Sequence, residues 1–345
     1  MDGGFVAKGR ARSGPDAPSS RSRQGSQAGP VGWALVAIVL INVTKGGSVL
    51  AIKLGLEGLS PLLSAGLRFS TAGLFLGVWL LFRRRFATRS GRTLRAELFP
   101  QGLGRWLSGA AVLMSLAYAL FYSALNLSLV SRTALFVNLN PFFVAVLAAL
   151  FLGERLGGLR WLGIAVAFSG VLFVEWHSLV RFGWSQFGLA DLLLVGSGLA
   201  WASQAVLKKH IADRVRPEVL TFWEVLMPGL ILLAWGSVSE GWGAMRLTGA
   251  AIWSLLYLVV PGTVLAFVGF NWVLRRADAS RVVPFSFLIP VTAFTLGTTV
   301  RGEPFSWSLL VAMAFVGLGL WLVSQNSRGG DRGGPENGTT PPHKN

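Results

Sequence analysis

The sequence predicts an all-α integral membrane protein with ten transmembrane helices, arranged as two inverted repeats of five helices. Three observations support this prediction. The 345 residues are 52% hydrophobic and only 13% charged, with a mean hydropathy of +0.57, whereas soluble domains carry about 25% charged residues. Apolar segments long enough to cross a bilayer recur along the chain, and motifs of the first half return in the second.

Ten apolar segments have a length close to the ~20 residues that span a hydrocarbon core. They lie at residues 31–53, 61–82, 106–126, 129–152, 158–178, 188–207, 218–238, 250–273, 280–300 and 306–325. The remaining ends, residues 1–30 and 326–345, are rich in Gly, Ser, Pro and Arg, and we expect them to be disordered tails. No cleavable signal peptide is visible.

Basic residues set the predicted orientation. With both termini in the cytoplasm, 24 Lys and Arg residues fall in cytoplasmic segments and five on the outer side, while Lys45 and Arg68 stay within the membrane. The net charge of +16 is thus mostly a topology signal. We expect no nucleic-acid partner, since no motif supports one. The prediction is a multi-pass protein of the cytoplasmic (inner) membrane, in contact with membrane lipids.

The repeat is visible as fixed offsets. At an offset of 149 residues, Ser131, Arg132, Pro141, Gly153 and Glu154 match Ser280, Arg281, Pro290, Gly302 and Glu303. Further upstream the offset is 156, and Pro61 matches Pro217. Because five is an odd number of spans, we expect the second repeat to be upside down relative to the first. Inverted repeats are typical of secondary transporters, in which one half rocks against the other around a midplane site.

Three segments carry a family resemblance. They are AIKLGLEGLSPLLSAGLRF (51–69), NPFF with FLGERLGGLRWLGIAVAFSGV (140–171) and ADLLLVGSGLAWASQAVLKK (190–209). They resemble the drug/metabolite transporter superfamily, in its ten-helix group with paired EamA-type repeats, here at 31–178 and 188–325. The resemblance implies an exporter-like fold with a central cavity and cytoplasmic termini. It also implies substrates that range over amino acids, other metabolites and drugs.

Lys45 lies in the middle of the first span, where a lone lysine costs about 2.5–3.5 kcal/mol to insert. Its repeat equivalent is Trp201, whereas the family usually has a tryptophan at both positions. Ser48 matches Gln204, and each pair shares one helix face. We interpret Lys45 as a group that binds an anion such as a carboxylate or changes its charge during the transport cycle. The alternative is a lysine that snorkels to the interface. The two glycines after it predict either close helix approach or a local break.

Arg68 and Glu224 are repeat equivalents of opposite charge, each seven residues after a matching proline. Both are expected to face the protein interior, since a charge facing lipid has no partner. One hypothesis is an ion pair between them, either static or switchable as a gate; another has the arginine reach the outer headgroups. Glu224 is also the leading candidate for proton coupling.

Other polar residues have two interpretations each. Tyr118, Asn138, Asn140 and Asn271 are expected either to hydrogen-bond a polar ligand or to join helices. The equivalent prolines Pro141 and Pro290 predict kinks, as hinges or as packing features. The equivalent glutamates Glu154 and Glu303 are expected to cap the helix that follows each of them in the chain.

The sequence contains no HExxH, GxSxG or Walker A motif and no cysteine, and its three histidines are scattered, so we expect neither an enzyme nor a bound metal or other cofactor. It predicts a secondary active transporter, an exporter of a small metabolite such as an amino acid, with protons as the candidate coupling ion. The alternatives are a carrier of another solute class, such as a nucleotide-sugar or a drug, and a membrane-embedded enzyme or lipid-handling protein. The predicted substrate-binding residues are Lys45, Ser48, Arg68, Tyr118, Asn138, Asn140, Trp201, Gln204, Glu224 and Asn271.

Overall fold

The structure is a computed structural model that describes residues 31–86, 102–153, 157–182, 188–209, 211, 214–243, 245–266, 269, 273 and 283–325. Every regular element over these residues is a helix. In chain order they are α1 (Val31–Gly55), α2 (Pro61–Phe86), α4 (Gly104–Leu127), α5 (Val130–Val137), α6 (Asn140–Leu152), α7 (Gly158–Phe182), α8 (Leu189–Lys209), α9 (Pro217–Ser239), α10 (Gly249–Val259), the π-helix η3 (Val260–Leu265), the 3-10 helix η4 (Val283–Phe287), α13 (Leu288–Val300) and α14 (Trp307–Gln325).

Helix occupies each of the ten segments that hydropathy singles out. Over the described residues, six helical segments are long and apolar enough to cross a membrane, and shorter apolar helices of 10–17 residues occupy the other four. The predicted all-α membrane fold is therefore confirmed. The predicted interruptions are also present: Pro141 lies in the first turn of α6, after a break that separates it from α5, and Pro290 lies near the start of α13.

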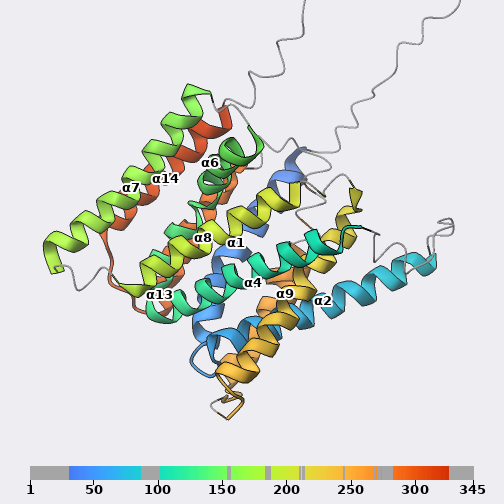
Figure 1. Cartoon of the computed structure of the whole chain (residues 1–345). Helices are drawn as coiled ribbons and strands as arrows, with labels where there is room; N and C mark the ends of the chain where they lie inside the picture. Colours follow the sequence, from blue (N-terminus) through green and yellow to red (C-terminus); the bar gives the residue numbers. More distant parts are fainter. Residues whose placement is uncertain are drawn as a thin grey trace, which may run out of the picture.

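The helices pack as two outer pairs around a central group (Figure 1). One pair is α2 with α9 and the other is α7 with α14. Between them, α8 packs against α4 and α6, and its repeat equivalent α1 packs against α10 and α13. These contacts correspond, because α10 is the equivalent of α4 and α13 is the equivalent of α6. The same packing scheme is thus used twice.

Glycines bring α2 and α9 close together. A Cβ atom added to Gly73 would lie 2.7 Å from the Cα atom of Leu226, and one added to Gly229 would collide with the backbone nitrogen of Ser70. Positions 73 and 229 are repeat equivalents, and so are 70 and 226. Replacing each residue of one contact by its repeat equivalent therefore gives the other contact. As residue numbers increase along α2, the residue numbers of the partners on α9 decrease. The two equivalent helices therefore run antiparallel, as an inverted repeat requires.

The pair α7 and α14 shows the same relation at the offset of 149. A Cβ atom on Gly163 would lie 2.8 Å from the carbonyl oxygen of Gly319, and one on Gly170 would lie 3.0 Å from that of Ala312. Position 163 is equivalent to 312 and position 170 to 319, so these contacts also exchange with the halves. Both outer pairs are therefore antiparallel crossings of equivalent helices, one from each repeat.

Candidate functional site

Arg68 and Glu224 lie at different levels of the bundle. The end at which α1 finishes is called the Gly55 end, and the opposite end the Val31 end. Gly66 packs against Leu233 and Gly229 against Ser70, so Arg68 is level with residues 229–233 of α9. That turn is roughly 10 Å along the axis from Glu224. Equal spacing from matching prolines places the two charges toward opposite ends, because α2 and α9 are antiparallel. The hypothetical ion pair between them is not formed, and each has other partners.

The guanidinium of Arg68 is buried, with 8% of the residue exposed. Its Nε donates to Oγ1 of Thr263 at 3.1 Å, its Nη1 to the hydroxyl of Tyr122 at 3.1 Å, and its Nη2 to the carbonyl oxygen of Gly262 at 3.4 Å. The Cζ atom lies 4.8 Å from the centroid of the Phe69 ring. Arg68 thus ties α2 to α4 and to η3, and it does not reach out to headgroups.

The partner of Arg68 on the other repeat is a π-helix that the sequence analysis did not predict. In η3 the backbone winds more loosely, and Pro261 supplies a local cause because it has no N–H for the α-helical ladder. The hydroxyl of Thr263 donates to the carbonyl oxygen of Leu258 at 2.8 Å while it accepts from Arg68. Single-turn π segments occur frequently at functional sites. The sequence shows the proline, which signals an irregular helix, but it does not show which backbone groups of η3 would face Arg68.

Tyr118 and Ser48 lie beside this arginine. The Tyr118 ring stacks on Phe69, with 4.0 Å between centroids. Ser48 is buried on α1 and donates to the carbonyl oxygen of Thr44 at 2.9 Å. Its hydroxyl is also the nearest atom to a Cβ placed on Gly262, at 2.8 Å. Predicted residues from α1, α2 and α4 therefore come together around η3.

Lys45 is half-buried on α1, one helical turn before Ser48. Helix α1 is continuous through the two glycines that follow Lys45. A Cβ on Gly46 would lie 2.6 Å from that of Thr292, and one on Gly47 would lie 2.6 Å from the hydroxyl oxygen of Tyr257. Of the two predicted roles for these glycines, close approach is observed and a helix break is not.

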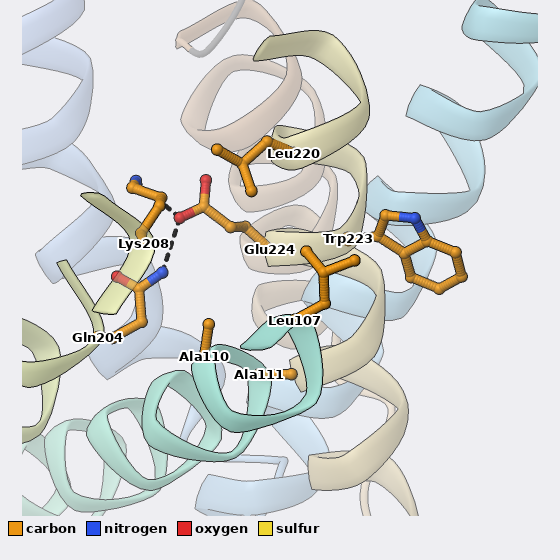
Figure 2. Close-up of a pocket in the computed structure, with 8 residues that line it drawn as sticks. All are labelled: Leu107, Ala110, Ala111, Gln204, Lys208, Leu220, Trp223 and Glu224. Atoms are coloured by element: carbon orange, nitrogen blue, oxygen red, sulfur yellow. Dashed lines mark hydrogen bonds and ion pairs between the residues drawn. The ribbon is translucent and has the colours of Figure 1, made fainter. Parts of the chain in front are cut away.

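Glu224 is held by two side chains of α8 (Figure 2). Its Oε1 accepts from Nε2 of Gln204 at 2.7 Å and lies 2.7 Å from Nζ of Lys208. Beside the three groups is a cavity of about 10 Å³, close to the space of one water molecule. Leu107, Ala110 and Ala111 of α4 line its other side. The cluster is at the Val31 end and joins α8 to α9.

Lys208 was missed as a site residue because it was counted with the loop that follows the span. A local signal was available, since Lys208 is four residues after Gln204 and so shares its helix face. Residues Gln204 and Glu224, both predicted, are brought together here.

The other predicted site residues are less closely connected. Asn138 is buried but donates to the carbonyl oxygen of Ala134 at 2.9 Å, within its own helix. Asn140 lies at the packing of α6 against α8, where its Oδ1 would be 3.0 Å from a Cβ on Gly198. Trp201 is half-buried on α8. Asn271 falls outside the described residues.

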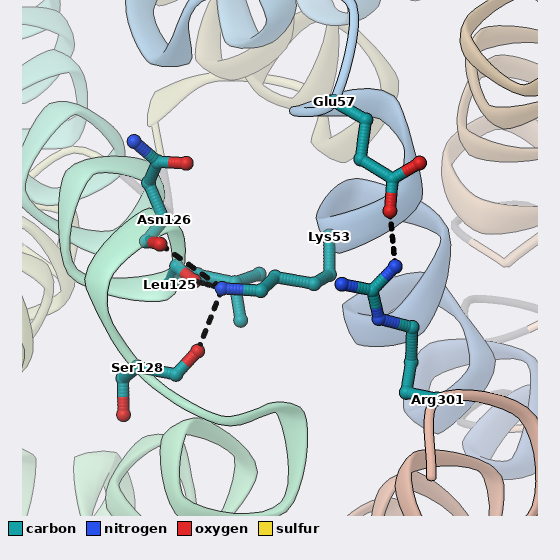
Figure 3. Close-up of polar contacts among 6 residues, drawn as sticks. All are labelled: Lys53, Glu57, Leu125, Asn126, Ser128 and Arg301. Atoms are coloured by element: carbon teal, nitrogen blue, oxygen red, sulfur yellow. Dashed lines mark hydrogen bonds and ion pairs between the residues drawn. The ribbon is translucent and has the colours of Figure 1, made fainter. Parts of the chain in front are cut away.

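Charged side chains gather at the Gly55 end (Figure 3). Nζ of Lys53 donates to three carbonyl oxygens at the end of α4, those of Leu125 at 2.7 Å, Asn126 at 3.0 Å and Ser128 at 2.8 Å. A cation at a helix C-terminus is favourable because the last carbonyls lack helical partners. Arg301, between α13 and α14, forms an ion pair with Glu57 after α1. From the sequence, Lys53 and Arg301 were assigned only as two of the five outer-side basic residues.

Two carboxylates of the second repeat cap helices of the first. Glu303 accepts from the N–H groups of Val130 at 2.6 Å and Ser131 at 3.2 Å, and from the Ser131 hydroxyl at 2.6 Å, all at the start of α5. Glu240 accepts from the N–H groups at the start of α2, those of Leu62 and Leu63, each at 3.0 Å. The prediction that Glu303 caps the helix following it was therefore wrong: inversion brings its loop over α5. Glu154 lies outside the described residues.

A further pair joins the halves at the same end. Arg132 of α5 binds Asp191 of α8 through two parallel bonds, Nε to Oδ1 at 3.0 Å and Nη2 to Oδ2 at 2.9 Å. Together with Lys53, Arg301 and Glu303, this pair lines a cavity of about 520 Å³. No local pattern in the sequence signals the pairing, because its members are 59 residues apart.

Known proteins are similar to this chain in sequence or in fold. The probable amino-acid metabolite efflux pump of Escherichia coli strain K12 is 27% identical over 297 residues, which cover 83% of this chain and 93% of that protein. The uncharacterized transporter YoaV of Bacillus subtilis strain 168 is 23% identical over 293 residues, covering 84% and 95%. A solved crystal structure with 19% identity has the same fold, with a TM-score of 0.60 over 86% of this chain and 98% of the other.

The names of these relatives indicate transporters rather than enzymes. The pattern of the EamA-like transporter family matches residues 32–176 and 188–325, nearly the whole described part of the chain. The chain belongs to the EamA-like transporter family.

Proposed function

We propose that this protein is a secondary active exporter of a small metabolite, such as an amino acid, that works by alternating access. The observation that carries the proposal is the antiparallel crossing of equivalent helices in both outer pairs. Two similar halves of opposite orientation can exchange conformations, which opens a central site to each side in turn. The name of the Escherichia coli relative, a probable amino-acid metabolite efflux pump, supports the solute class and the direction.

The proposed orientation places the Gly55 end outside the cell and both termini in the cytoplasm of a cell with a cytoplasmic membrane. It rests on the excess of basic residues in the segments that adjoin the Val31 end. The charges at the Gly55 end then face the outside, and the Glu224 cluster faces the cytoplasm.

The proposed solute path passes between the halves, from the Glu224 cluster to the Arg68 site. On that path we assign solute contacts to Ser48, Arg68 and Tyr118, which surround η3, and to Gln204 and Glu224. The remaining predicted substrate-binding residues are proposed to line the same path: Lys45, Asn138, Asn140, Trp201 and Asn271.

Glu224 is the proposed proton-sensitive group. Its ionised carboxylate binds Lys208 and Gln204, and a proton on Oε1 would compete with both donors. Protonation would therefore loosen the tie between α8 and α9. The alternative role is a static salt bridge.

The test is flux of labelled amino acids in sealed vesicles, with and without a pH gradient. Glu224→Gln should lower gradient-driven flux by about tenfold or more, and by a larger factor than it lowers solute exchange without a gradient. Glu57→Gln, which removes an exposed acid at the other end, is the matched control and should keep gradient-driven flux. Full gradient-driven flux in Glu224→Gln would remove the coupling role, and no flux in the wild type would remove the transport proposal.

A further inference from the structure

Arg68 differs from the other buried charges in the described part of the chain by the kind of partner it has. Asp191 pairs with Arg132 and Glu224 with Lys208, while the partners of Glu303 are neutral groups at the start of α5, where the helix dipole supplies partial positive charge. The partners of Arg68 are a threonine hydroxyl, a tyrosine hydroxyl, a backbone carbonyl and an aromatic ring. All of them are neutral.

A buried guanidinium without an opposite charge is expensive inside a membrane protein. Neutral oxygens satisfy some of its N–H groups but do not compensate the net charge, and the cost of removing it from water is several kcal/mol. Arg132, which is also largely buried, has a carboxylate at 2.9 Å. Among the residues that the structure describes, no carboxylate contacts Arg68, and a bound anion would supply the missing negative charge.

We infer that Arg68 is the receptor for the carboxylate of the transported solute, which makes the substrate class a carboxylic acid such as a free amino acid. This inference rests on the proposed transport function. The guanidinium has five N–H donors, and the three observed bonds use one on each nitrogen. One N–H remains on Nη1 and one on Nη2. Two N–H groups of one guanidinium match the two oxygens of a carboxylate.

The neighbouring groups suit the same ligand. The oxygen of Tyr122 accepts from Arg68, so its own O–H is left to donate to the anion. The stacked rings of Tyr118 and Phe69 form an aromatic wall next to the guanidinium. The bond from Nη2 to Gly262 is the longest of the three, at 3.4 Å, and is the one that a carboxylate would most easily replace. Binding would then loosen the link between α2 and η3.

The test compares matched ligands on the purified full chain. Each L-amino acid is titrated beside its amide, which keeps the side chain and the ammonium group but replaces the carboxylate with a neutral group. We expect the wild type to bind at least one amino acid about tenfold or more tightly than its amide. Arg68→Gln should abolish that preference, because it lowers the affinity for the amino acid and leaves the affinity for the amide unchanged. Arg68→Lys should restore part of it, because lysine keeps the charge without the fork.

Two further variants complete the experiment. Arg301→Gln removes an exposed arginine and should keep the preference, whereas Tyr122→Phe should lower the affinity for the acid alone by a few-fold. If Arg68→Gln does not fold, Arg68→Lys and Tyr122→Phe decide, and an unchanged preference in both overturns the inference.

The inference and the proposed function fail separately. A wild type that drives flux in vesicles but binds acids and amides equally overturns the role of Arg68 and leaves transport standing. A wild type that prefers acids through Arg68 but shows no flux overturns the transport proposal and leaves the role of Arg68 in binding the carboxylate standing. Wild-type preference in Arg68→Gln overturns the inference directly.

Discussion

The two halves of this protein touch in two physically different ways. In the crossings of α2 with α9 and of α7 with α14, glycines place backbone against backbone or side-chain stem, with no room for an added methyl group. At the Gly55 end, charged side chains of one half reach across to the other half through a few hydrogen bonds. Packed backbones cannot separate without a void, whereas water can replace a hydrogen bond. The crossings are suited to serve as pivots, and the charged contacts as the set that opens.

The sequence repeats the two kinds of contact differently. The crossing glycines Gly73 and Gly229 are repeat equivalents of each other. The ion pairs at the Gly55 end are repeated only in part: Arg132 has an equivalent arginine, Arg281, but the equivalents of Asp191 and Arg301 are leucines, at positions 35 and 152. Glu303 has an equivalent glutamate, Glu154. The pivots are therefore symmetric, whereas neither ion pair has both of its partners repeated, which gives the two ends different chemistry.

The largest effect is expected at a crossing. A methyl group on Gly229 would lie 2.6 Å from the carbonyl carbon of Phe69, and backbone cannot move aside as a flexible side chain can. Gly229→Ala should destabilise the protein by about 3 kcal/mol, the upper part of the range for overpacking. The measurement is the melting temperature and the monodisperse fraction in detergent.

The matched control for that substitution is Gly104→Ala. Gly104 begins α4, and nothing lies within 4 Å of an added Cβ. This variant should therefore melt at or slightly above the wild-type temperature, because alanine favours helix. Equal melting temperatures for Gly229→Ala and Gly104→Ala would show that the crossing yields, and the pivot interpretation would be lost.

The next largest effect is expected at Glu303, a buried carboxylate among the charged contacts. Glu303→Gln keeps the shape but turns an acceptor-only group into one with an NH₂ that faces donors of Ser131. The expected loss is about 2 kcal/mol, since a buried polar group is left unsatisfied. Unfolding measurements check it, with Ser131→Ala as the companion variant, which should cost less. An unchanged free energy of unfolding would mean that α5 does not depend on this cap.

These residues also show how far the sequence leads. Hydropathy predicts the ten segments, and a repeat unit with an odd number of spans predicts that the second half is inverted. The fold therefore follows from patterns that are visible in the sequence. Inversion further implies that Arg68 and Glu224 lie toward opposite ends, a step that the ion-pair hypothesis overlooked. Helical spacing was enough to add Lys208 to the Glu224 cluster. The cap from Glu303 to α5 follows from no local signal, because loop closure between the halves decides it.

A smaller effect is expected for Arg132 and Asp191, whose side chains are 17% and 8% exposed. Two parallel bonds in a partly wet site should couple them by about 1–2 kcal/mol. A double-mutant cycle with Arg132→Gln and Asp191→Asn measures this coupling in unfolding experiments. The chain has no cysteine, so a single Ser128→Cys label can report on the same end. Each variant should label faster than the wild type, and additive stabilities with unchanged labelling would remove this pair from the contacts that open.

The smallest effect is expected for the ion pair of Glu57 and Arg301, whose side chains are 50% and 31% exposed. Water and salt screen such a pair, and holding two long side chains costs entropy, so Glu57→Gln should change stability by less than about 0.5 kcal/mol. Unfolding in low and high salt checks this. If Glu57→Gln lost as much stability as Asp191→Asn, burial would not determine how much each of these contacts contributes to stability. The charges of the Gly55 end would then act as one network, which opens as a unit while the crossings remain packed.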